Sequence, residues 1–284
     1  MSHLTNADLH CHSVVSDGTL TPEALAMRAK AQGVELWSLT DHDELGGQSL
    51  AIDAATRIGL PYLTGTEISV SFATATVHIV GLGFDHTDAD LVNGLHETRG
   101  GRELRARAMA ADLERVGIGG AYEGALRYVG NPELISRTHF ARFLVDTGVC
   151  AETYEVFRRF LVEGKPGYVP HRWASLRDAV GWITGAGGVA VIAHPARYPF
   201  SAIEEYALFT EFVQLGGQGV EVVTSAHSAS EATKYAGYCH EFGLLASRGS
   251  DFHSPQESRI DLGQLPDLPG QLTPVWERLE ARIH

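Results

Sequence analysis

The chain contains a series of short apolar runs, several of which end in a histidine or a carboxylate. In the first run His10 and His12 alternate with the apolar Leu9 and Cys11, and Asp17 follows His12 by five residues. Side chains alternate between the two faces of an extended segment, so both imidazoles are expected on one face. Two histidines alone could be surface residues without a function. Whether they belong to a metal site depends on the later runs.

The later runs carry the same residue types at their ends. Imidazole nitrogens and carboxylate oxygens without thiolates suit manganese, iron or zinc, and more than four ligands exceed the needs of one tetrahedral ion. Taken singly, His78 or His194 is more often a core histidine. The joint placement at expected strand ends instead predicts a multinuclear metal site that includes His10, His12, Asp41, His42, Glu67, His78, His194, Asp251 and His253.

Strand and helix patterns alternate over most of the chain, which predicts an α/β fold with a mainly parallel sheet. Ligands at the carboxyl ends of the strands predict a barrel with its active face at that end. We expect strands at residues 6–13, 35–42, 61–72, 76–84, 188–195, 219–224 and 244–253, the third and fourth as a hairpin. We expect helices at 22–32, 47–58, 203–215, 228–242 and 275–283. The first should begin with Thr21 as its N-cap and end at Gly33, and the second should end at Gly59.

Residues 89–166 interrupt this alternation with helical patterns. We expect helices at 91–117, 122–129, 138–147 and 151–161. This stretch predicts an inserted helical subdomain that covers the substrate, while residues 1–88 and 167–284 form the barrel domain.

The composition narrows the choice of partners. A formal net charge of −13 over 284 residues provides no general basic field, which argues against duplex DNA. No run approaches the ~18 apolar residues of a membrane span. Cys11, Cys150 and Cys239 are isolated and lack a CxxC spacing, which predicts neither a disulfide framework nor a zinc-thiolate site and favours a cytoplasmic protein. The oligomeric state is not predicted.

Four ordered motifs carry a family resemblance. They are residues 8–13 (DLHCHS), 40–43 (TDHD), 193–195 (AHP) and 249–253 (GSDFH). Together they resemble the motifs of the PHP (polymerase and histidinol phosphatase) phosphoesterases. The resemblance implies a distorted (β/α)7 TIM-like barrel with three divalent metal ions at its mouth, manganese being expected and iron or zinc being the alternatives.

The same resemblance implies how the ligands are shared. One ion would be held by His10, His12, Glu67 and Asp251, a second by Glu67, His78 and His194, and a third by Asp17, His42 and His253. His194, Asp251 and His253 are the expected catalytic residues. Asp41 and Asp43 would lie outside the ligand set and orient its members.

The expected chemistry follows from charge. A phosphate ester repels an incoming hydroxide, so divalent ions must neutralise the ester and lower the pKa of a bound water. We expect metal-bound hydroxide to attack phosphorus in line. Residues 185–188 are glycine-rich but lack the lysine and hydroxyl of a phosphate-binding loop, and their pattern is more typical of a helix end.

Candidate substrate-binding residues lie in the insertion and after the expected strands. At Ser136 a helix begins whose backbone N–H groups, with Arg137, could hold a second phosphate. An ordinary N-capped helix with a solvated arginine fits the sequence equally well. Arg197 follows the 193–195 motif and is better placed to reach a phosphate. The remaining candidates, which could equally be ordinary surface or supporting groups, are His139, Lys165 and His227.

Residues 136–139 and the helical insertion resemble one bacterial branch of the family, which includes 3′,5′-nucleoside bisphosphate phosphatases and 5′-to-3′ exoribonucleases of short RNA. This resemblance implies removal of the 3′-phosphate from a small nucleotide such as adenosine 3′,5′-bisphosphate, leaving AMP, or trimming of short single-stranded RNA from its 5′ end. A histidinol phosphate phosphatase is the enzyme alternative. A non-catalytic or proofreading metal-binding module is the alternative of another class.

Overall fold

Two hydrogen-bonded sheets form the centre of the computed structural model, which describes residues 5–284. The small sheet pairs β1 (Ala7–Asp8) with β2 (Leu36–Trp37) in parallel. The large sheet has the order β5 (Ala174–Ser175), β3 (Gly65–Phe72), β4 (Ala75–Leu82), β6 (Val189–Ile192), β7 (Gly219–Thr224) and β8 (Leu245–Gly249). Adjacent strands of this large sheet are parallel, except that β4 runs antiparallel to both β3 and β6. The predicted hairpin of the third and fourth strands is confirmed.

Single bridges join the two sheets at both edges. On one side the backbone N–H of Leu9 donates to the carbonyl of Arg248 at 3.0 Å, and a parallel bridge links Cys11 with Phe252. On the other side a bridge links His42 with Glu67. No continuous ladder of strand pairing crosses from one sheet to the other, because β1 and β2 have only two residues each. The α/β class is confirmed, but the pairing of the described strands does not confirm the predicted closed barrel.

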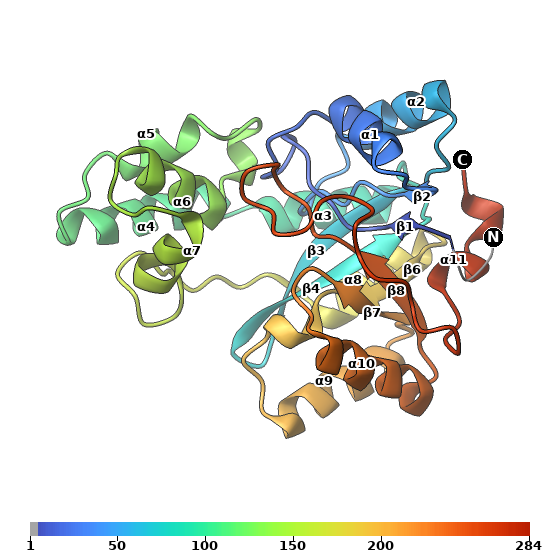
Figure 1. Cartoon of the computed structure of the whole chain (residues 1–284). Coiled ribbons are helices and arrows are strands. Elements are labelled where there is room, and N and C mark those ends of the chain that lie inside the picture. The colour runs from blue at the N-terminus through green and yellow to red at the C-terminus, as the bar shows by residue number, and fades with distance from the viewer. Residues whose placement is uncertain (1–4) are drawn as a thin grey trace.

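Helices flank the strands on opposite sides. Figure 1 shows α1 (Pro22–Ala31) and α2 (Gln48–Ile58) on one side and α9 (Ala202–Gln214) and α10 (Ala229–Phe242) on the other. The remaining elements here are α8 (Leu176–Gly185), α11 (Val275–Arg278) and the 3-10 turns Pro195–Arg197 and Glu280–Arg282. Within residues 5–284, no helix combines the length and apolar character needed to cross a membrane.

Local sequence signals set several helix ends. The Thr21 side chain accepts a hydrogen bond from the Ala24 N–H at 3.2 Å, which caps α1 as its sequence predicts. α2 ends at Gly59, which adopts the left-handed conformation with φ of 60°. The sequence therefore predicted both helices to within about two residues.

The apolar residues of the sheets divide into two adjoining cores. Leu9 belongs to the larger core beneath the main sheet, and Cys11 belongs to the smaller one beneath α1 and α2. The predicted alternation of the opening stretch is thus confirmed, because these two residues are buried in the packing layers while His10 and His12 reach the site described below.

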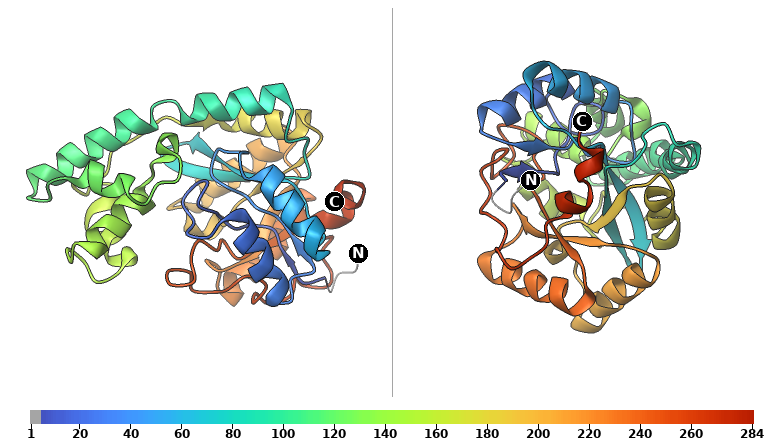
Figure 2. Two further views of the ribbon diagram at one scale, coloured as in Figure 1. Left: turned by 90° about the horizontal axis from the view of Figure 1, so that it is seen from above. Right: turned by 90° about the vertical axis from the view of Figure 1, so that its right-hand side faces the viewer.

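The helical stretch projects from the strands, as Figure 1 and the left view of Figure 2 show. Its elements are α3 (Ala89–Arg99), α4 (Arg102–Arg115), α5 (Ala121–Leu126), the 3-10 turn Pro132–Leu134, α6 (Arg137–Asp146), α7 (Thr153–Val156) and the π-helical turn Phe157–Leu161. The predicted single helix over 91–117 is wrong. It breaks at Gly100 and Gly101, where Gly101 has a φ of +106° that L side chains rarely adopt.

The break separates two packing environments. Leu91 and Leu95 of α3 belong to the main core, and α3 packs against α8. The helices after the break pack around a core of their own, which includes Met109, Leu113 and Phe140. The division at residue 89 remains a prediction.

Candidate active site

The nine predicted ligand residues converge on one site: seven of them follow the ends of β1, β2, β6 and β8, whereas Glu67 lies within β3 and His78 within β4, not at strand ends as the sequence predicted. Their donor atoms form four overlapping groups, and in each group these atoms lie within 4.8 Å of one another. The groups are His12, Asp17, His42 and His253; His10, Glu67 and His194; His10, His12 and Asp251; and His42, Glu67 and His78. Their roles as ligands remain predictions.

Backbone geometry at the strand ends places these side chains. His194 follows β6 with a φ of 27°, and Asp251 follows β8 with a φ of 54°. Such positive values are uncommon for residues other than glycine and cluster at functional sites. His78 reaches the cluster from β4, where it pairs with Ser69, two residues beyond Glu67 on β3. The two turns and the hairpin thus bring side chains from the ends of β6 and β8 and from within β3 and β4 together.

Glu67 lies at the centre of the cluster. Its Oε1 lies 2.8 Å from Nδ1 of His78 and 2.9 Å from Nε2 of His194, and its Oε2 lies 2.9 Å from Nδ1 of His42. Burial alone would raise the pKa of Glu67, but His78 and His42 outweigh it and hold the pKa well below its usual range. The carboxylate is therefore ionised, as a ligand that bridges two cations must be.

Several buried polar atoms of the cluster have no hydrogen-bond partner within the described residues. They include Nε2 of His10, both ring nitrogens of His12 and Oδ1 of Asp17. Burying such atoms without a partner is costly, so native structures rarely do so. A bound cation would satisfy them.

The spacing and protonation of these atoms also fit cations. His12 Nε2 lies 3.2 Å from Asp251 Oδ1, and His10 Nε2 lies 3.5 Å from the same oxygen. Ligands bonded at about 2.1 Å to one ion lie roughly 3.0–3.5 Å apart. Burial and the neighbouring His253 and His42 lower the pKa of His12 to about 3. His12 is thus neutral, which is the form of imidazole that binds metals.

Carboxylates behind the cluster hold its loops. Asp41 accepts hydrogen bonds from the N–H of Ser13 at 2.8 Å and from the Ser16 hydroxyl at 2.6 Å, which shapes the loop that carries Asp17. Asp43 accepts from the backbone N–H of Ser69 at 2.7 Å. Both aspartates lie outside the four donor groups and contact their neighbours, as the resemblance implied.

The sequence reasoning missed Glu221. Its two carboxylate oxygens lie 2.7 Å from Nδ1 of His10 and 2.7 Å from the backbone nitrogen of His194. A carboxylate in the middle of the apolar strand β7 was the available signal, because such a group is buried only where it has partners.

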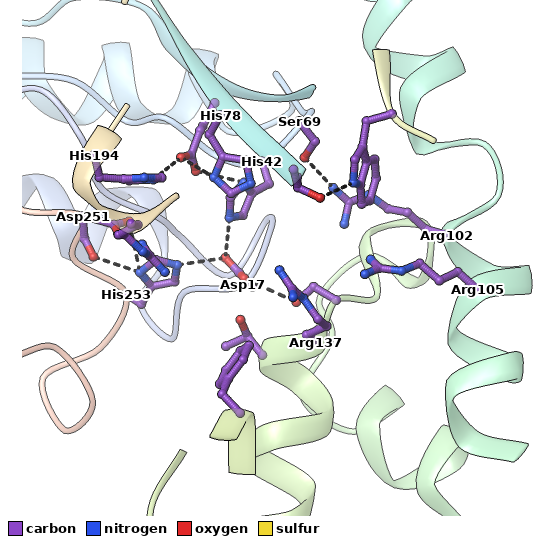
Figure 3. A pocket seen from close by; sticks show the side chains of 17 residues that line it. Asp17, His42, Ser69, His78, Arg102, Arg105, Arg137, His194, Asp251 and His253 are labelled. Carbon is purple, nitrogen blue, oxygen red and sulfur yellow. Dashed lines mark hydrogen bonds and ion pairs between the residues drawn. The ribbon is translucent and has the colours of Figure 1, made fainter. Parts of the chain in front are cut away.

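A single cavity adjoins both the cluster and the insertion, and Figure 3 shows residues from both on its walls. The cluster contributes its carboxylates and most of its histidines. The other lining residues are Ser69, Thr76, Arg102, Arg105, Ser136, Arg137, Thr138, Phe157, Trp173 and Arg197.

Arg102, Arg105 and Arg137 face the cluster across this cavity (Figure 3) and are called the arginine wall below. Arg102 forms a buried ion pair with Asp43, whereas Arg105 and Arg137 donate to the backbone carbonyls of Val169 and Leu161. Burial and the neighbouring arginines lower the pKa of Arg105 to about 9. Within residues 5–284, neither Arg105 nor Arg137 pairs with a carboxylate, so the wall is suited to an anion.

The predicted substrate-binding residues separate into two sets. Arg137 and Arg197 line the cavity, and Arg197 Nη1 lies 2.6 Å from Asp251 Oδ2. His139, Lys165 and His227 do not line it. The His139 ring is buried and caps its own helix, because its Nδ1 accepts the N–H of Ser136 at 3.0 Å.

His227 lies with its Nδ1 3.0 Å from the carbonyl of Val222.

Sequence reasoning missed Arg102 and Arg105 as cavity residues. Their spacing of three on one helix face was the available signal.

Comparison with known proteins agrees with these features. The model of the PHP domain matches residues 8–136. A 3′,5′-nucleoside bisphosphate phosphatase from Chromobacterium violaceum is 52% identical over 280 residues, which cover 99% of this chain and 98% of that protein. The chain belongs to the PHP domain family. A relative from Haemophilus influenzae, named a 5′-3′ exoribonuclease, is 40% identical over 95% of this chain and 98% of its own length.

Solved structures share the PHP fold of this chain. An amidohydrolase from Chromobacterium violaceum, with bound sulfate and no metal, has a TM-score of 0.96 at 52% identity and covers 98% of this chain and 97% of its own. A predicted metal-dependent phosphoesterase from Bifidobacterium adolescentis has a TM-score of 0.82 at 28% identity, with coverage of 97% and 96%.

Proposed function

We propose that this chain hydrolyses the 3′-phosphate of nucleoside 3′,5′-bisphosphates, for example adenosine 3′,5′-bisphosphate to AMP. The observation that carries the proposal is the arginine wall, which faces the carboxylate and imidazole cluster across one cavity. A substrate with two phosphates would place one at the cluster and the other at the arginine wall. The relative from Chromobacterium violaceum with this activity spans nearly the same length, which supports the assignment.

The cluster would hold divalent ions. We propose three of them, manganese first and iron or zinc as alternatives, with Glu67 shared between two. When bound, such ions neutralise the negative charge of a phosphate and lower the pKa of a water molecule. His194, Asp251 and His253 are the proposed catalytic residues, since they line the cavity as well as belonging to the donor groups.

The arginine wall would bind the other phosphate. Arg105 and Arg137 each retain guanidinium N–H groups beyond those given to carbonyl oxygens, and an arginine can bind phosphate through two parallel hydrogen bonds. Arg102 lies over the Trp173 ring at 4.6 Å and is held by Asp43, so its guanidinium is fixed before substrate arrives. Prior ordering of this kind reduces the entropy lost on binding.

A second candidate function is the removal of nucleotides from the 5′ end of short RNA. The exoribonuclease from Haemophilus influenzae and a groove that continues from the cavity favour it. Histidinol phosphate hydrolysis and a non-catalytic metal-binding module remain the alternatives to be tested. A ligand set with members missing would have favoured the module, but here all nine expected ligand residues are present.

We also propose the domain division at residues 88/89 and 166/167, and the distorted barrel as the best description of strands joined by single bridges. The bridges at Cys11–Phe252 and His42–Glu67 support the barrel. The buried, unpaired cysteines fit the proposed cytoplasmic location.

The test compares substrates on metal-reconstituted protein. Manganese, iron and zinc forms are each assayed with adenosine 3′,5′-bisphosphate, histidinol phosphate and an aryl phosphate, and released phosphate is measured. We expect the highest kcat/KM with the bisphosphate and no activity in Asp251→Ala or His194→Ala, while the exposed His240→Ala retains activity. Preference for histidinol phosphate, or full activity of both cluster variants, would refute the proposal.

A further inference from the structure

The insertion contacts the loops that carry one particular donor group of the cluster. This group contains His12, Asp17, His42 and His253, and we call it the Asp17 group. Of the four groups found within residues 5–284, it is the only one that contains Asp17 or His253. Asp17 lies in the loop after β1, and His253 lies in the loop after β8. The geometry of the Asp17 group therefore depends on how both loops are placed.

The first contact joins the start of α6 to Asp17. The Ser136 hydroxyl donates to Asp17 Oδ2 at 3.3 Å, while Asp17 Oδ1 lies 3.4 Å from Nε2 of His253. Gly130 approaches the same loop so closely that a Cβ at this position would lie 2.2 Å from the carbonyl oxygen of Val14. The insertion thus packs directly on the segment that carries Asp17.

The second contact lies farther along the same helix. Arg142 of α6 pairs with Glu257 through two parallel hydrogen bonds, from Nε to Oε1 at 2.8 Å and from Nη2 to Oε2 at 2.7 Å. Arg142 is buried and Glu257 is half-buried. A paired contact of this kind fixes orientation as well as charge. It joins the insertion to the loop after β8, which Figure 1 shows in red beside the green helices.

Glu257 is linked to His253 through the next residue of the chain. The Ser258 hydroxyl accepts the backbone N–H of His253 at 2.8 Å and that of Ser254 at 3.1 Å. The Ser258 N–H donates to the Ser254 carbonyl at 3.0 Å, which closes the turn. Nδ1 of His253 lies 2.9 Å from the carbonyl of Asp251, which leaves Nε2 directed at the Asp17 group. A displacement of Glu257 would therefore move the backbone of His253.

The helix with these contacts also carries part of the arginine wall. α6 begins at Arg137, which lines the cavity, and carries Arg142 farther along. We propose, resting on the metal centre proposed above, that the Arg142–Glu257 pair is a positioning contact for the Asp17 group. It holds α6 against the loop after β8, so the affinity of this group for a divalent cation depends on the insertion. One helix thereby sets the spacing between that cation and the arginine wall.

The other donor groups have supports of a different origin. Glu221 on β7 contacts both His10 and His194 at 2.7 Å. Arg197, in the turn after β6, contacts Asp251 at 2.6 Å. These supports come from the main sheet and the turns that follow its strands, and α6 does not contribute to them. Loosening α6 should therefore weaken one binding step and spare the others.

The test measures manganese binding by calorimetric titration and by equilibrium dialysis with elemental analysis. Supporting contacts change metal affinity by about 10–100-fold, so we expect Arg142→Ala to weaken one binding step by about tenfold and leave the others unchanged. Glu257→Gln should weaken the same step less, since the amide keeps one accepting oxygen. Arg142→Ala combined with Glu257→Ala should lose no more than Arg142→Ala alone, because the two residues act through one contact.

The matched control is Arg107→Ala. It breaks an exposed ion pair with Glu103 on α4, also within the insertion, and should leave every binding step unchanged. Ser258→Ala is a second variant that tests the same connection without touching the ion pair. It removes the acceptor of the His253 N–H and should weaken the same step as Arg142→Ala.

Kinetics add a measurement that a loss of stability alone would not change. An aryl phosphate has no second phosphate, so its turnover does not require the arginine wall. We expect kcat of Arg142→Ala for an aryl phosphate to fall at limiting manganese and to recover at saturating manganese. Arg107→Ala should follow the wild-type manganese dependence throughout.

The outcomes separate this proposal from the function on which it rests. Lower thermal stability of Arg142→Ala with unchanged manganese stoichiometry and affinity would make the pair a purely structural contact and overturn the proposal. An equal loss at every binding step, or a loss of kcat that saturating manganese does not restore, would also overturn it and leave the phosphatase standing. Wild-type protein that binds no manganese and releases no phosphate would remove both proposals.

Discussion

Glu221 Oε1 lies 2.7 Å from Nδ1 of His10, in the buried layer behind the metal cluster. The contact directs the other ring nitrogen, Nε2, toward Glu67 and Asp251, which lie 3.4 and 3.5 Å away. The second oxygen of Glu221 accepts the backbone N–H of His194 at 2.7 Å. One carboxylate therefore orients two predicted ligands from separate strand ends.

Replacing Glu221 with glutamine should weaken metal binding. The His10 ring and the backbone N–H of His194 each donate a hydrogen bond to Glu221. The amide of glutamine has only one accepting oxygen, so its NH2 group would face one of these two donors and that hydrogen bond would be lost. Loss of such a supporting contact typically lowers metal affinity by about 10–100-fold. Calorimetric titration with manganese measures it, with the exposed Glu211→Gln as control. Equal affinity in both variants would show that Glu221 does not orient the ligands.

Replacing Arg137 with alanine should raise KM for adenosine 3′,5′-bisphosphate by about 10–100-fold, because charged hydrogen bonds contribute about 1.5–3 kcal/mol each. KM for an aryl phosphate should change far less, since that substrate has no second phosphate. Arg158→Ala, an exposed arginine in the turn after α7, is the matched control. Equal effects on both substrates would exclude Arg137 from second-phosphate binding.

Chelation should abolish phosphate release and lower thermal stability together. Ions that bind only the folded state stabilise it by about 2.7 kcal/mol at a free concentration 100 times the Kd. Removing them also leaves buried atoms such as His12 Nε2 without partners. Calorimetry before chelation, after it, and after adding manganese, iron or zinc measures the change. Retained activity in protein shown by elemental analysis to be metal-free would contradict the metal centre.

Replacing Phe140 with alanine tests the proposed domain division. Phe140 is buried in the core of the insertion, and such truncations cost about 3–5 kcal/mol. Hydrogen exchange should increase in residues 102–166 and stay unchanged in β3, β6 and β7. The control Leu104→Ala, whose side chain is 75% exposed, should change little. A uniform increase over the whole chain would instead show one cooperative unit.

Local patterns predicted most regular elements because their signals lie within a few residues. The caps at Thr21 and Gly59 and the apolar strand β7 are examples. The long helix over 91–117 failed because its apolar spacing continued across Gly100 and Gly101, and backbone freedom at those glycines outweighed it. Barrel closure could not be predicted, since it depends on register between strands distant in sequence.

The sequence by itself determined the chemistry of the site: residue types that bind metals, at the ends of apolar runs and in four ordered motifs. The structure brought all nine together, but their sharing among ions depends on distances that the sequence does not contain. Glu221 and the arginine wall appeared only in the tertiary structure. Each joins residues from separate elements, and which elements meet is decided by packing rather than by local pattern.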